Sequence, residues 1–164
     1  MDIDTLDTFR LYQIDPEGRL FISPEVNDWQ PLADAGITAV IDLDCKLDTS
    51  VPTMPNSVLY IFWPIDDRRE LPDERLLTTI GQLGASLLAQ GHKVVCQCGM
   101  GQNRSALIAG MILLHCGLSG REAVALIRSH REGALWNQTF RNYLLSRPPL
   151  GEATLFQRQA RKAA

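Results

Sequence analysis

The fold is decided by the stretch VVCQCGMGQNRSALIAGMILLHC, residues 94–116. Its start, Val94–Cys96, is apolar and largely β-branched, which predicts a short central strand. Its second half, Ser105–Cys116, is apolar on most faces of a helix, which predicts a deeply buried helix that Gly117 ends. A glycine-containing loop joins the two. A strand that leads through such a loop into a buried helix is typical of α/β proteins.

Further strands are expected before this unit. Asp15–Gly18 has turn chemistry and is flanked by two short stretches with strand character, which predicts a hairpin. Two apolar stretches after it are separated by a polar loop at 44–57, and a short helix precedes them. The expected elements are the hairpin strands Arg10–Ile14 and Arg19–Ser23, the helix Trp29–Ala35, and the strands Ile37–Leu43 and Val58–Trp63.

Three more helices are expected from periodicity and capping. Leucines recur at helical spacing between Pro72 and Gly91. Ser119 and Glu122 form a capping box that opens a helix running to about Arg131. Asn137 is expected to cap a last helix that ends before Pro148.

This order of elements predicts an α/β fold. A single domain, residues 1–149, is expected to hold a central, mostly parallel sheet of about five strands with helices on both faces. Residues 150–164 are rich in Arg and Ala and are interpreted as a tail or a frayed helix. In such sheets ligands bind beyond the carboxyl ends of the strands, which draws attention to the loop after residue 96.

Composition narrows the classes of partner. The chain has 164 residues, of which 45% are hydrophobic, and a net charge of −3, so it lacks the basic surface with which proteins bind nucleic acid. The longest apolar run, Ala106–Leu114, is far shorter than the about 20 residues that span a bilayer. Because the N-terminus is acidic, no export signal is expected. We therefore expect no membrane insertion and a cytoplasmic location, while the oligomeric state stays open.

The loop from Cys98 to Ser105 has the residues of an oxyanion site. Five residues separate Cys98 from Arg104, enough to close a loop whose N–H groups converge on one tetrahedral oxyanion. Gly99 and Gly101 permit the backbone angles that this needs. The positive end of the following helix points to the same place and favours a thiolate at Cys98. Arg104 offers a planar fork for two oxygens, and Ser105 can donate a hydrogen bond to the sulfur.

A reaction at such a site also needs a proton donor. Asp66 and Asp67 follow the expected strand that ends at Trp63, so they lie at the same edge of the sheet. A carboxylic acid there can protonate a leaving oxygen and later activate water as a base. Either aspartate serves chemically, and spacing does not separate them.

On these residues the chain resembles the cysteine-dependent protein tyrosine phosphatase superfamily, and more closely its dual-specificity branch. The resemblance covers roughly residues 19–146. It is strongest in the loop that begins at Cys98. Gly36–Leu43 is similar to an early core strand of that branch, and Pro64–Asp67 is similar to its general-acid loop. A third set of residues is similar to its terminal helices: Glu122, Arg128, Arg131, Asn137 and Phe140.

The resemblance implies a role for each site residue. Cys98 is the nucleophile, Arg104 clamps the phosphate, Ser105 assists release, and Asp67 is the acid because it stands three positions after the proline. The phosphate-binding loop is then Gly99, Met100, Gly101, Gln102, Asn103 and Arg104. No metal or other cofactor is implied, and the expected substrates are phosphotyrosine, phosphoserine or phosphothreonine in proteins, or another phosphomonoester. In one departure, Gln97 stands where the family usually has His, so the thiolate loses a charged neighbour.

Other interpretations stay open. A rhodanese-like sulfurtransferase also uses a Cys in an anion-binding loop, and a phospho-binding module would bind without turnover. Cys96 and Cys98 with His92 or His115 are a weak metal pattern because no second Cys pair has ligand spacing. Cys45 follows a neighbouring strand and is a possible redox partner that would form a reversible disulfide with Cys98.

Overall fold

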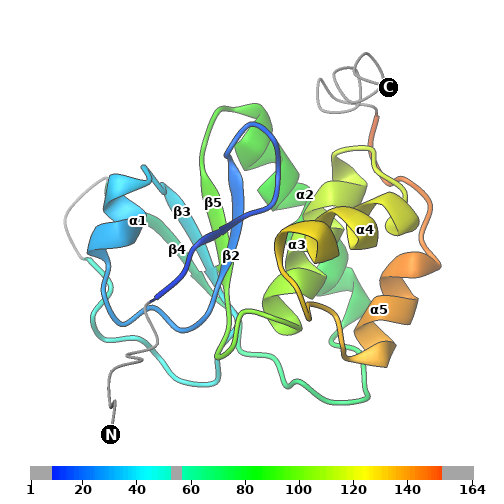
Figure 1. The fold of residues 1–164 in the computed structure, drawn as a ribbon, viewed down its shortest axis with the longest axis horizontal. Coiled ribbons are helices and arrows are strands. Elements are labelled where there is room, and N and C mark those ends of the chain that lie inside the picture. The colour runs from blue at the N-terminus through cyan, green and yellow to red at the C-terminus, as the bar shows by residue number, and fades with distance from the viewer. Residues whose placement is uncertain (1–8, 53–56, 153–164) are drawn as a thin grey trace, which may run out of the picture.

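The computed structural model describes residues 9–52 and 57–152, and within them the strands form one five-stranded sheet (Figure 1). The order across the sheet is β1-β2-β5-β3-β4. Only β1 is antiparallel to its neighbour. The strands are β1 Tyr12–Gln13, β2 Leu20–Ser23, β3 Ala39–Asp42, β4 Leu59–Phe62 and β5 Val94–Gln97. The expected mostly parallel sheet is confirmed.

Helices lie on both faces of the sheet, as expected, but unequally (Figure 1). One short helix packs with a small apolar cluster on one face, and four helices cover the other. They are α1 Gln30–Asp34 on the first face, and α2 Glu74–Ala89, α3 Arg104–His115, α4 Gly120–His130 and α5 Gln138–Leu145 on the second. Within the described residues, no helix has the length and apolarity needed to cross a bilayer.

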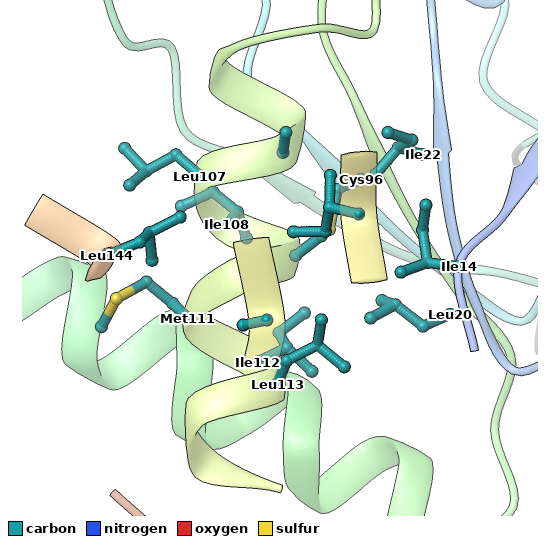
Figure 2. Packing of buried hydrophobic residues seen from close by; sticks show 14 of the residues in the cluster. Ile14, Leu20, Ile22, Cys96, Leu107, Ile108, Met111, Ile112, Leu113 and Leu144 are labelled. Atoms are coloured by element: carbon teal, nitrogen blue, oxygen red, sulfur yellow. The ribbon is translucent and has the colours of Figure 1, made fainter. Parts of the chain in front are cut away.

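The buried helix α3 is the centre of the core. It packs against β2 and β5 on one side and against α2, α4 and α5 on the others. Figure 2 shows Leu107, Ile108 and Met111 of α3 among residues from the strands and α5. Contact on all sides explains why this segment is apolar on most faces. A helix with one side in solvent has its apolar residues in a single stripe that faces the core. The helix α2 approaches it closely at Gly84, where an added Cβ would lie 2.4 Å from Ile112 Cδ1.

The parallel strands end level with one another at one edge. In the register of the sheet, Gln97 at the end of β5 pairs with Ser23 of β2 and with Asp42 of β3, and Asp42 pairs with Phe62 of β4. The loops that follow β3, β4 and β5 therefore begin side by side. This brings residues 43–45, 63–67 and 98–103 together although the sequence separates them widely.

The expected element boundaries differ from the observed ones by a few residues. The hairpin strand β1 is limited to Tyr12–Gln13, and α3 begins at Arg104 rather than at Ser105. Such boundaries vary most at the ends of strands and in the first turn of a helix. Leu150 N and Gly151 N donate to Leu114 O at the end of α3, at 2.9 and 3.2 Å, and residues 153–164 of the expected tail lie outside the described residues.

Candidate active site

The loop of residues 98–103 points its carbonyl groups away from its own centre. Four successive carbonyl oxygens accept hydrogen bonds from other segments. The bonds run from Glu25 N to Gly99 O (3.2 Å), from Arg131 Nη2 to Met100 O (3.3 Å), from Arg131 Nε to Gly101 O (3.2 Å) and from Leu135 N to Gln102 O (2.9 Å). Within the described chain, no backbone N–H group of residues 99–103 donates to a protein acceptor. The loop thus has its donors free for a ligand, as an anion cradle requires.

Gly101 allows the loop to lie against the end of β2. Its φ of +61° is in the left-handed region, and an added Cβ would lie 2.6 Å from the carbonyl carbon of Ser23 and from Pro24 N. Both the backbone conformation and the close approach exclude a side chain. The sequence-based reason for glycine at this position is supported by the structure.

Cys98 lies between the end of β5 and the first turn of α3. Its side chain is 2% exposed, and its Sγ is 3.3 Å from the Oγ of the buried Ser105. The unpaired N–H groups at the start of a helix carry partial positive charge, which attracts an anion to this place. Once the sulfur is ionised, the Ser105 hydroxyl is the donor of that hydrogen bond.

Arg104, the first residue of α3, is anchored through one nitrogen. Its Nη1 donates to Leu43 O and Ile65 O, both at 3.2 Å, and lies 3.4 Å from Asp44 Oδ1. Its side chain is 14% exposed, and Nη2 would lie 3.3 Å from a Cβ added at Gly99. No hydrogen bond from Nη2 to the described part of the protein is formed. The guanidinium is therefore fixed by the loops after β3 and β4, with Nη2 at the 98–103 loop.

The two candidate acids occupy different environments. Asp67 Oδ2 accepts from Asn103 Nδ2 at 2.8 Å, and Asp67 Oδ1 accepts from Asn137 Nδ2 at 2.7 Å. The side chain of Asp66 is 60% exposed and pairs with Arg68 Nε at 3.4 Å. Both aspartates are exposed, and of the two only Asp67 is hydrogen-bonded to the loop that holds Cys98.

None of the four cysteines is in a disulfide; all are reduced thiols. Burial raises the pKa of Cys96, and burial also raises the pKa of Cys116 to about 11, so both are held as neutral thiols. Cys45 is exposed and its Sγ is 3.8 Å from Arg104 Nη1. Its disulfide with Cys98 stays a prediction. Within residues 9–52 and 57–152, no group of three or more His, Cys, Asp or Glu could hold a metal ion.

Two hollows flank the loop. One, of about 650 Å³, is lined by Asp67, Arg68, Arg69, Trp136, Asn137, Gln138 and Thr139. The other, of about 310 Å³, includes Gly99 and Met100 together with Arg10, Tyr12 and Arg131. Met100 is 66% exposed, and Trp136, 59% exposed, donates through Nε1 to Gln102 Oε1 at 3.3 Å. The loop is therefore open to a ligand that extends to either side.

Sequence reasoning missed the residues from distant segments that hold the loop and Asp67. Arg131 lies over the ring of Tyr12, 4.3 Å from its centroid, while it bonds two loop carbonyls. Asn137 caps α5 as predicted, with Phe140 N donating to its Oδ1 at 3.3 Å, but its amide also reaches Asp67. Asp44 was expected only as part of a polar loop. No local pattern marks these contacts, since each joins segments far apart in the chain.

No family model and no curated protein matches this sequence. Solved structures do match. Human DUSP28 is 23% identical with a TM-score of 0.70 over 82% of this chain and 89% of that one. A mouse putative dual specificity phosphatase complexed with zinc tungstate is 20% identical with a TM-score of 0.70 over 99% and 97%. Tk-PTP in its active form is 25% identical with a TM-score of 0.64 over 82% and 92%. The chain thus has a dual-specificity phosphatase-like fold.

Proposed function

We propose that this chain is a cysteine-dependent phosphatase that hydrolyses phosphomonoesters through a cysteinyl-phosphate intermediate. One observation carries the proposal: between Cys98 and the buried helix α3, four loop carbonyls are bonded outward, and the backbone N–H groups of residues 99–103 bond to no acceptor in the described chain. That arrangement fits a tetrahedral dianion next to a thiolate. The dual-specificity phosphatase-like fold supports it.

In the first step the Cys98 thiolate attacks phosphorus and the bond to the ester oxygen breaks. The loop N–H groups and the Arg104 guanidinium bind the non-bridging oxygens, whose charge develops in the transition state. Asp67 gives its proton to the leaving oxygen, so an alcohol or phenol departs. The phosphoryl group is now bonded to sulfur, and Asp67 is a carboxylate.

In the second step water attacks the cysteinyl phosphate. Asp67 takes the proton from water, inorganic phosphate forms, and the sulfur leaves as a thiolate. The hydroxyl of Ser105, 3.3 Å from the sulfur, stabilises that thiolate by donating a hydrogen bond. The enzyme returns to its starting state with no metal and no other cofactor in the cycle.

The proposed substrates are proteins that carry phosphotyrosine, phosphoserine or phosphothreonine. The open hollows on both sides of the loop and the exposed Met100 and Trp136 suit a peptide chain that continues past the phosphorylated residue. The loop itself contains no Lys, which disfavours a highly charged inositol lipid.

The decisive experiment is hydrolysis of p-nitrophenyl phosphate and of a phosphopeptide panel. We expect Cys98→Ser to lose all turnover, and Asp67→Ala to lose about 10²–10³-fold in kcat because it removes the acid. Asp66→Ala, the matched control one residue away, should lose less than about threefold. Full activity in Cys98→Ser would overturn the mechanism, and a larger loss in Asp66→Ala would reverse the choice of acid.

Two other outcomes would replace the proposal. Transfer of sulfur from thiosulfate to cyanide without phosphatase activity would identify a sulfurtransferase. Binding of phosphopeptides without any hydrolysis would identify a phospho-binding module.

A further inference from the structure

The carboxylate of Asp67 is held from two sides by amide groups. Asn103 Nδ2 donates to one oxygen at 2.8 Å and Asn137 Nδ2 to the other at 2.7 Å. The three residues come from the loop after β4, the loop after β5 and the N-cap of α5. Asn103 is 2% exposed and Asn137 is 8% exposed, so both donors are buried, while Asp67 itself is exposed at the rim. Hydrogen bonds to a charged group are stronger than those between neutral groups.

The two amides also fix each other's orientation. Asn103 Oδ1 accepts from Asn137 N at 2.9 Å, so its Nδ2 must face Asp67. Asn137 Oδ1 accepts from Phe140 N at 3.3 Å as the cap of α5, so its Nδ2 is left for Asp67 and for Arg68 O at 2.8 Å. Rotating either amide by 180° would lose bonds at both ends. The donors are therefore set before substrate binds.

We propose that Asn103 and Asn137 are positioning residues that hold Asp67 in place for proton transfer to the leaving group. The inference rests on the proposed phosphatase function and deepens it. An amide N–H bonds strongly to an ionised carboxylate oxygen, whereas the protonated oxygen of a carboxylic acid is a donor. The two bonds therefore strengthen as the proton passes from Asp67 to the leaving oxygen. The two hydrogen bonds therefore favour the first step, in which Asp67 acts as an acid.

Leaving-group dependence tests this directly. 2,4-Dinitrophenyl phosphate releases a stable phenolate without a proton, and phenyl phosphate needs one. We expect Asn103→Ala and Asn137→Ser to lose at least about tenfold in kcat/KM with phenyl phosphate, and a several-fold smaller factor with the dinitrophenyl ester. Serine at 137 keeps the capping oxygen of α5, so this variant isolates the amide.

Thr139→Val is the matched control. The Thr139 hydroxyl donates to Arg69 O at 2.9 Å, which is another bond from α5 to the same loop but one that does not touch Asp67. We expect this variant to change kcat/KM by the same factor with both esters. In an Asp67→Asn background, adding Asn103→Ala should cause no further leaving-group-dependent loss, because the group that it positions is already gone.

Each result decides the inference. An equal loss with both esters in Asn103→Ala and Asn137→Ser would show a merely structural role. A leaving-group-dependent loss that persists in the Asp67→Asn background would also overturn it. If Asn103→Ala does not fold, Asn137→Ser decides alone. Absence of any hydrolysis that Cys98→Ser abolishes would overturn the proposed function and this inference with it, whereas Cys98-dependent turnover with equal losses overturns this inference only.

Discussion

Gly101 and Gly91 both adopt a left-handed backbone, yet their surroundings differ. A Cβ at Gly101 would meet the backbone of Ser23 and Pro24 at 2.6 Å, while a Cβ at Gly91 would meet nothing within 4 Å. We expect Gly101→Ala to displace the loop and lower kcat/KM for p-nitrophenyl phosphate at least about tenfold, because strain of 1–3 kcal/mol falls on the anion cradle. Weaker inhibition by vanadate should accompany the loss.

Gly91→Ala is the control for backbone strain alone. It should cost about 1 kcal/mol of unfolding free energy in a urea titration and leave kinetics unchanged. Equal kinetic effects of the two substitutions would contradict the packing argument.

The cysteines should also differ sharply in reactivity. At pH 7 we expect iodoacetate, an anion, to modify Cys98 in its cradle and the exposed Cys45, and to leave Cys96 and Cys116 intact in the folded protein. Burial raises the pKa of both of the latter, so at pH 7 they stay neutral thiols, which are poor nucleophiles. Mass spectrometry of the peptides measures this. Vanadate should protect Cys98 from modification and should not protect Cys45. Rapid labelling of Cys96 would contradict its description as a buried, neutral thiol.

At the scale of elements, the end of α4 supports the loop of residues 98–103, the proposed phosphate-binding loop. Arg131 bonds Met100 O and Gly101 O through two different nitrogens. Lysine has a single nitrogen and cannot reproduce that fork. We therefore expect Arg131→Lys to weaken vanadate inhibition about tenfold, which corresponds to the loss of one such bond.

Arg121→Lys provides a comparison on the same helix. Arg121 is exposed, and the substitution retains its charge. Its vanadate inhibition constant should match that of the wild type. If Arg131→Lys binds vanadate equally well, the loop holds its shape without the fork.

At the scale of the whole molecule, stability should fall at alkaline pH. Burial raises the pKa of Cys116 from its ordinary 9.0 to about 11, and also raises the pKa of Cys96. Above pH 9 the unfolded chain therefore releases protons that the folded protein keeps, which favours unfolding. Cys116 alone accounts for a loss of about 2 kcal/mol between pH 9 and 11.

Urea denaturation between pH 8 and pH 10.5 measures this slope. Cys116→Ala should lower the stability at pH 8 and show a shallower decline above pH 9. A flat profile for the wild type would contradict the burial of these thiols.

The sequence predicts the parts of this molecule that are local. The strand, loop and buried helix at 94–116 were predictable from hydrophobic pattern, and Cys98, Arg104 and Ser105 from their spacing within one loop. Spacing left Asp66 and Asp67 equal, and the resemblance to a known family favoured Asp67, which the structure places against Asn103. Leu135 shows what local pattern misses. Its left-handed φ of 58° contradicts the preference of leucine and accompanies a bond from its N–H to Gln102 O, 33 residues back.

The outward bonds of the phosphate loop have a consequence for synthesis. Two of its carbonyls are satisfied by Arg131 and a third by Leu135, and the amide of Asn137 completes the hold on Asp67. A growing chain whose Cys98 has already left the ribosome still lacks these partners while α5 is inside it. Under the proposed function, turnover can therefore begin only once α5 has emerged.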